Sequence, residues 1–76
     1  MTQTEWRNIF SDNLTSLLQE KGMSQIQLAR DSGVSMGMIS DYINKRSVPG
    51  TFALINMAYA LDVEVSDLVD FGDRVH

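Results

Sequence analysis

The stretch that most constrains the fold runs over residues 24–43 and reads SQIQLARDSGVSMGMISDYI. Ser24 is a favourable N-cap, with Gln27 three residues on as in a capping box, so a helix is expected to follow it. Gly33 supplies the positive φ that a sharp reversal needs, and Ser35 is a second N-cap. Apolar residues then recur at helical spacing, namely Met38, Ile39, Tyr42 and Ile43. The pattern predicts two short helices joined by a tight glycine turn.

The spacing within this stretch resembles the helix-turn-helix of the Cro/C1 phage-repressor family, also called the xenobiotic-response-element type. Counted from Gln25, the fourth, fifth, ninth, tenth, fifteenth and eighteenth positions match, occupied by Leu28, Ala29, Gly33, Val34, Ile39 and Tyr42. The fifth residue lies where the helices cross and must be small, the ninth must turn, and the others fill the wedge between the helices. The resemblance covers about residues 10–69. It implies an all-α fold, a five-helix bundle of the lambda-repressor-like DNA-binding type, with its helix-turn-helix over residues 25–44.

Length and composition narrow the other possibilities. The 76 residues are expected to form a single domain over residues 1–71, followed by a loose tail over residues 72–76. The chain has no cysteine, and its one histidine is His76, so we expect no metal site, no cofactor, no small-molecule ligand and no enzyme. The apolar residues are too dispersed for a membrane span, and no signal segment opens the chain. We therefore expect a cytoplasmic protein without membrane contact.

The charge is unusual for a DNA-binding domain, which is expected to be basic. The net charge is −4, yet residues 1–50 hold five acidic and five basic side chains. The whole acidic excess lies in residues 51–76, where Arg74 is the one basic residue against five acidic ones. This distribution is compatible with DNA binding but predicts a weak non-specific attraction to DNA.

Caps and apolar periodicity predict the helices outside the central stretch. A polar arm over residues 1–4 is expected to precede the first helix, which places Ser11 on its exposed side. Ile55 is expected in the buried stripe of the fourth helix, and Ser66 is expected to cap the last one. The helices are predicted over residues 5–21, 25–31, 35–44 and 51–61, with a short last helix that ends near residue 69.

The resemblance implies that the second helix of the central stretch enters the major groove of DNA. Its positions for reading bases are occupied by Ser35, Met36, Gly37, Ser40 and Asp41. Relatives often carry glutamine, asparagine or arginine there, whereas methionine offers only apolar contact, for instance to a thymine methyl group. Gly37 costs about 1 kcal/mol of helix stability relative to alanine, which favours a close approach of the backbone to DNA.

The resemblance also implies a set of phosphate-binding residues, namely Gln25, Asn44, Lys45 and Arg46. Lys45 stands where the family usually has glycine, so either Asn44 or Lys45 is expected to take the left-handed conformation. Many members of the family carry an arginine paired with a glutamate at the two positions that Leu18 and Ile43 occupy in this chain. Replacing a buried ion pair by two aliphatic residues is often neutral or stabilising, so the fold is expected to tolerate them.

Four apolar residues remain once one small core is filled, and they are candidates for a dimer interface: Phe52, Tyr59, Val63 and Phe71. The prediction is a transcriptional regulator, a Cro-like phage protein or another small repressor, that binds a palindromic operator in double-stranded DNA as a homodimer. The alternative is a protein-interaction module such as an anti-repressor, in which Met36, Met38 and Tyr42 form an adaptable apolar surface.

Overall fold

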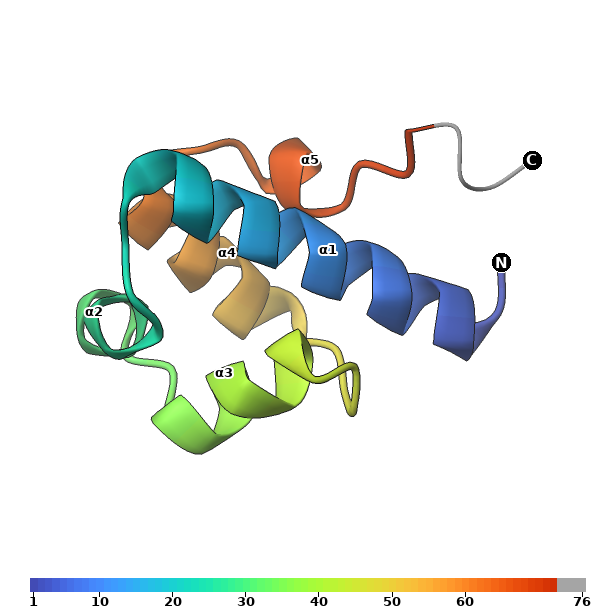
Figure 1. Ribbon diagram of the computed structural model, residues 1–76, viewed down its shortest axis with the longest axis horizontal. Coiled ribbons are helices and arrows are strands. Elements are labelled where there is room, and N and C mark those ends of the chain that lie inside the picture. The colour runs from blue at the N-terminus through green and yellow to red at the C-terminus, as the bar shows by residue number, and fades with distance from the viewer. Residues whose placement is uncertain (73–76) are drawn as a thin grey trace.

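The computed structural model describes residues 1–72, which fold into five α-helices. Figure 1 shows the long first helix with the third helix on one side of it and the fifth on the other. None of the described helices is both long and apolar enough to cross a bilayer. Of the tail expected over residues 72–76, only Gly72 lies within the described residues. The all-helical bundle is confirmed, with α1 (Gln3–Lys21), α2 (Gln25–Ser32), α3 (Met36–Ile43), α4 (Thr51–Leu61) and α5 (Val65–Leu68).

α1 begins two residues earlier than the sequence predicts because its N-terminus carries a capping box. The Thr2 hydroxyl accepts a hydrogen bond from the Glu5 backbone N–H at 3.1 Å, and the Glu5 carboxylate accepts one from the Thr2 N–H at 2.9 Å. Hydrogen bonding to the Glu5 carboxylate, first from the Thr2 backbone N–H and then from the Thr2 side chain, holds the pKa of Glu5 below its ordinary value. The expected polar arm is therefore partly the first turn of a helix.

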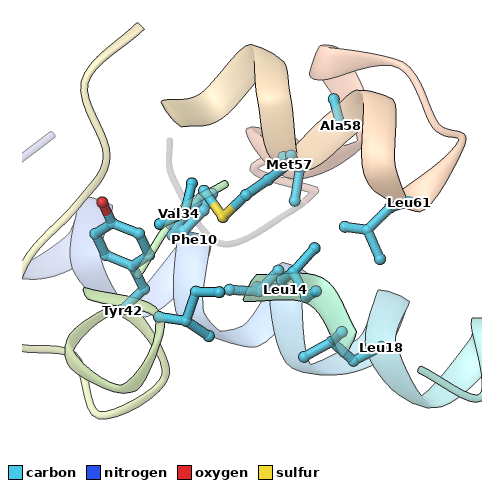
Figure 2. Close-up of a cluster of buried hydrophobic side chains, with 11 residues drawn as sticks. Phe10, Leu14, Leu18, Val34, Tyr42, Met57, Ala58 and Leu61 are labelled. Carbon is cyan, nitrogen blue, oxygen red and sulfur yellow. The ribbon is translucent and has the colours of Figure 1, made fainter. Parts of the chain in front are cut away.

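A cluster of buried apolar side chains lies between the helices (Figure 2). The ring of Phe10 on α1 meets the ring of Tyr42 on α3 edge to face, with their centroids 5.7 Å apart. Val34, in the turn between α2 and α3, is buried in the same cluster. Its other members are Leu14, Leu18, Leu28, Ile39, Met57, Ala58, Leu61 and Leu68. Because every helix contributes to it, this one core orients all five.

Ser11 is buried, and its predicted place on the exposed side of α1 is wrong. Its hydroxyl donates a hydrogen bond of 2.7 Å to the carbonyl oxygen of Ile43, the last residue of α3. The last carbonyls of a helix have no partner within it, so a serine of α1 caps the C-terminal end of α3. The prediction failed because the 3.6-residue period places polar residues on the solvent side of a helix. It contains no information on the packing of α3 across this part of α1.

Two predictions for the C-terminal half are also wrong. Ile55 is 51% exposed, because Met57, Ala58 and Leu61 form the buried side of α4. α5 begins after Glu64 rather than after Ser66. The Glu64 N–H donates to the carboxylate of Asp67 at 3.0 Å, a cap that a search for serine at the helix start misses.

Asn13 connects α1 to the segment after α5. Its side-chain amide nitrogen, Nδ2, donates to the carbonyl oxygens of Leu68 and Asp70 at 3.0 and 2.9 Å. A four-residue helix has little stability of its own, so this polar contact and the burial of Leu68 hold α5 against α1.

Replacing Tyr42 with phenylalanine is expected to leave the free energy of unfolding unchanged or to raise it by up to about 1 kcal/mol. The hydroxyl of Tyr42, at the edge of the cluster in Figure 2, is buried and has no hydrogen-bond partner within residues 1–72. Burial, and then the charge of Asp41, raises the pKa of Tyr42. The unfolded chain therefore loses this proton first as the pH rises past about 10, and the native state loses stability there.

Urea unfolding at about pH 8 and about pH 10.5, on either side of the ordinary tyrosine pKa, measures both effects. The Tyr42→Phe variant should lose less stability between the two values than the unaltered protein. Tyr59→Phe is the matched control, because the Tyr59 side chain is exposed. A Tyr42→Phe variant that is clearly destabilised at the lower pH would mean that the hydroxyl has a partner after all.

Candidate nucleic-acid interface

The turn between α2 and α3 sets the angle at which α3 is presented. Gly33 adopts the left-handed conformation with φ of 75°, as predicted. The Ser35 hydroxyl accepts a hydrogen bond from the Met38 N–H at 3.2 Å and so begins α3. At the start of α2 the Ser24 hydroxyl accepts from the Gln27 N–H at 3.1 Å. The four residues predicted to fill the wedge between the helices are buried: Leu28, Val34, Ile39 and Tyr42.

α3 buries one side and presents the other to solvent. Ile39 and Tyr42 are buried in the core. Since successive helical residues lie about 100° apart around the axis, the opposite side centres on Gly37 and Asp41. Two of the five residues expected to read bases therefore lie at the centre of the exposed side of α3.

The flanks of this exposed side differ in chemistry. Met36 and Met38 lie on either side of Gly37 and are 41% and 48% exposed. Ser40 is half-buried, and Ser35 is exposed but already accepts the capping hydrogen bond. The first turn of α3 thus presents mainly apolar surface to solvent, and Met38 belongs to it as much as Met36 does.

Gln25 is the first residue of α2 and lies half-buried beside a shallow groove. Leu18 and Ile43 line the same groove, so two aliphatic side chains border it where the resemblance implies an ion pair. Leu18 is buried and Ile43 partly buried, which shows that the fold accommodates the exchange. Gln25 lies at a helix N-terminus, whose unpartnered N–H groups favour a nearby anion.

The backbone of the loop after α3 shows which of Asn44 and Lys45 takes the left-handed conformation. Lys45 takes the left-handed conformation with φ of 64°, while Asn44 has φ of −89°. The side-chain Nδ2 of Asn44 donates to the carbonyl oxygen of Ser40 at 2.8 Å. The Arg46 N–H donates to the carbonyl oxygen of Asp41 at 2.8 Å. The amide of Asn44 is therefore engaged in the last turn of α3.

Both basic residues of this loop are paired with carboxylates. The Arg46 Nε lies 3.0 Å from Asp41 Oδ1, and the Lys45 Nζ lies 3.4 Å from Asp12 Oδ1. All four side chains are roughly half exposed, so neither pair adds much to stability. Their effect is on the local field, because two carboxylates offset the most basic stretch of the chain. One pair also joins Asp41, expected to read bases, to Arg46, expected to bind phosphate.

Several acidic residues of the C-terminal half serve local structure. Asp62 is the C-cap of α4 in the left-handed conformation, Asp67 caps α5, and Asp70 Oδ1 accepts from the Gly72 N–H at 2.9 Å.

No group of three or more histidine, cysteine or carboxylate side chains in residues 1–72 could hold a metal ion.

The residues expected at a dimer interface fall into two groups. Phe52 and Tyr59 lie on α4 and are 79% and 87% exposed. Ile55 lies on the same side, because positions 52, 55 and 59 follow the helical spacing of three and four. We call these three residues the α4 stripe. Val63 is partly buried against the core, and Phe71 lies beyond the end of α5.

Replacing Lys45 with glycine is expected to raise the free energy of unfolding by roughly 0.5–1 kcal/mol, the strain relieved less the extra chain entropy of glycine. The exposed ion pair with Asp12 offsets little of this gain. The same variant should bind DNA more weakly because a cation is lost. Thermal unfolding and DNA titration measure the two effects.

Asp62→Gly is the matched control, since Asp62 is also left-handed, with φ of 57°, at the C-cap of α4. It should gain less stability, because aspartate tolerates this conformation, and should leave DNA affinity unchanged. Lower stability in Lys45→Gly would show that the Lys45 side chain, not its backbone, holds the loop.

A protein-family model described as helix-turn-helix matches residues 14–68 of the chain. The match begins within α1 and ends at the last residue of α5, so it includes α2, α3 and the loop after them. No curated protein and no solved structure gives a match. The family match supports a DNA-binding regulator of transcription in general.

Proposed function

Because this chain belongs to the helix-turn-helix family of the Cro/C1 type, we propose that it is a repressor that binds a palindromic operator as a homodimer. The observation that carries the proposal is the exposed side of α3, which stands beside the loop that holds Lys45 and Arg46. A major groove about 12 Å wide admits a helix presented in this way. Two α3 helices about 34 Å apart would occupy successive major grooves and so exclude polymerase or a competing regulator.

Phosphate contacts would set the register of the protein on DNA. Arg46 supports this role because the pair with Asp41 uses Nε, while its two terminal nitrogens make no hydrogen bond within residues 1–72. Asp41 would hold the guanidinium from one side as the terminal nitrogens meet a phosphate. Lys45 would exchange Asp12 for a phosphate, and Gln25 and Asn44 complete the proposed phosphate set.

The exposed side of α3 would recognise the DNA sequence. The proposed base-reading residues are Ser35, Met36, Gly37, Ser40 and Asp41. The two ion pairs make this surface nearly neutral, so non-specific attraction to DNA would be weak. A larger share of the binding energy must then come from close fit in the groove and from the second protomer.

The protein-interaction alternative has support from the exposed Met36 and Met38, because methionine surfaces adapt to different partners. Tyr42, however, is buried and cannot belong to the surface that this alternative requires. Phosphate binding by the loop after α3 has no role in it. DNA binding therefore accounts for more of the features of this face.

Selection from a random duplex library at moderate salt tests the proposed function. The expected product is an inverted repeat whose half-site centres lie about one helical turn apart, because two α3 helices would read it on one face of DNA. Circular dichroism of the same sample establishes that the protein is folded. A folded protein that enriches no sequence would overturn the proposal and leave the interaction module as the better reading.

Replacing Arg46 with alanine should weaken binding to every duplex sequence and lower the slope of log K against log salt by about 0.9, the value for one phosphate contact. The ion pair is exposed, so the fold should be unaffected. Arg30→Ala is the matched control, because Arg30 is also exposed but lies at the other end of α2 from Gln25. Equal salt slopes for both variants would exclude Arg46 from the interface.

The α4 stripe supports the proposed homodimer. Three large apolar side chains are exposed on one side of a helix that has no charged residue. Contiguous exposed apolar patches mark protein–protein interaction sites. A two-fold axis through the stripe would bring it against its own copy. α4 packs on α2, so such a dimer would fix the two helix-turn-helix units relative to each other.

Replacing Tyr59 with glutamate should convert the dimer to a monomer at micromolar concentration, because two like charges would meet in the interface. Tyr59 is exposed in the protomer, so the monomeric variant should still unfold cooperatively on heating. Sedimentation velocity reports the oligomeric state. Ser66→Glu on α5 is the control, since Ser66 is exposed outside the stripe. A Tyr59→Glu variant that remains dimeric would place the interface elsewhere.

A further inference from the structure

The methionines of the chain differ in how far solvent reaches them. Met57 is buried in the core, and Met23 is partly buried against it. Met36 and Met38, on the two flanks of the exposed side of α3, are 41% and 48% exposed. Met1, the remaining methionine, is exposed and precedes the N-cap of α1. The two methionines of the proposed reading helix are thus open to a reagent in solvent, whereas the two that support the fold are shielded.

An exposed methionine is open to one defined chemical change, the oxidation of its thioether to a sulfoxide by a peroxide. A lone pair of the sulfur attacks one peroxide oxygen, and an S–O bond forms as the O–O bond breaks. The hydroxide that leaves takes the proton of the transferred oxygen and becomes water. The sulfur thus loses two electrons and the peroxide gains them. The chain has no cysteine, so no thiol of its own competes for the oxidant.

We propose that Met36 and Met38 are a reversible oxidation site through which hydrogen peroxide releases the protein from its operator. The inference rests on the proposed function, since it needs α3 to lie in the major groove. In that complex the thioethers would make apolar contacts, and a sulfoxide would place a polar acceptor oxygen there without a partner, which weakens binding. A dithiol reductant reverses the step: the sulfoxide oxygen leaves as water with the two thiol protons, and the dithiol becomes a disulfide.

The positions of the two side chains confine the effect to binding. Neither methionine is in the described core or among the side chains packed against it. α3 is held by the buried Ile39 and Tyr42, and the Ser35 cap uses the backbone N–H of Met38 rather than its thioether. A sulfoxide carries no net charge, so the proposed phosphate contacts would be retained. Oxidation would therefore remove sequence-specific affinity and leave the fold and the salt dependence as they are.

The first test maps the oxidation on the full chain without DNA. The folded protein is treated with hydrogen peroxide, and its peptides are analysed by mass spectrometry at intervals. Met36 and Met38 should be oxidised well before Met57, with Met23 between them, in the order of their exposure. Circular dichroism should show that the sample oxidised at the exposed methionines still unfolds cooperatively on heating. Oxidation of Met36 and Met38 no faster than that of Met57, or loss of the fold when they are oxidised, would overturn the proposal.

The second test compares DNA binding before and after this treatment, on the duplex recovered by selection and on an unrelated duplex. Oxidation should lower the affinity for the selected duplex by about tenfold, as expected for a polar group buried without a partner. The slope of log K against log salt and the affinity for the unrelated duplex should not change, because no charge is altered. Methionine sulfoxide reductases for both sulfoxide epimers, supplied with a dithiol, should restore the affinity.

Protein variants assign the effect to these two side chains. The double variant Met36→Leu, Met38→Leu has apolar side chains that peroxide does not oxidise, so treatment should not change its affinity for the selected duplex. Each variant is compared with its own untreated sample, because the substitutions themselves alter the reading surface. Met23→Leu is the matched control, since it removes a methionine that packs against the core, and it should keep the full response to peroxide. A double variant that still loses affinity would overturn the proposal.

The outcomes separate this proposal from the proposed function. Sequence-specific binding that survives full oxidation of Met36 and Met38 would overturn the oxidation site and leave operator binding standing. A loss of affinity with a lower salt slope would do the same, because it would mean that phosphate contacts had been lost. A folded, unoxidised protein that selects no duplex would overturn the proposed function and the release from DNA together.

Discussion

The packing of α3 against α1 is the constraint on which the rest of the molecule depends. α3 has eight residues, too few to be a stable helix by itself in water, so its form comes from its contacts. The edge-to-face contact of Tyr42 with Phe10 and the hydrogen bond from the Ser11 hydroxyl to the Ile43 carbonyl both hold the last turn of α3. These two anchors leave the helix one possible outer side.

Local chemistry explains why so much of this fold could be predicted from the sequence. N-caps, a left-handed glycine and apolar spacing act within a few residues, and these predicted the turn at Gly33 and the start of α3. The missed caps at Thr2 and Glu64 are local, but the wrong predictions for Ser11 and Ile55 concern contacts between distant segments. Ser11 forms a hydrogen bond with Ile43, 32 residues away. The burial of Ile55 was predicted wrongly because α4 is apolar on nearly every side. Periodicity cannot choose the buried side of such a helix.

The candidate interface was less predictable for the same reason. The position of α3 and its outward residues follow from spacing, but the charge environment does not. Lys45 meets Asp12 across 33 residues, and Arg46 folds back on Asp41 only because the loop turns through a left-handed lysine. Counting charges along the chain predicts a balanced N-terminal part whose loop after α3 is locally basic. The folded chain has the same charges with each loop cation next to a carboxylate.

This arrangement bears on how a protein of net charge −4 can act on DNA. A nearly neutral reading surface releases few counterions, so non-specific DNA would hold it weakly and the ratio of specific to non-specific binding would depend on fit. In the proposed complex, apolar contact from Met36 and Met38 would add to the fit without adding to non-specific binding. A single half-site would then bind weakly. In the proposed dimer, once one α3 is in its groove the second binds as an intramolecular step, at an effective concentration set by the rigid connection from α4 to α2. In the proposed complex, the exposed methionines of α3 would provide selectivity at little non-specific cost, and the α4 stripe would restore the affinity that a basic surface would have supplied.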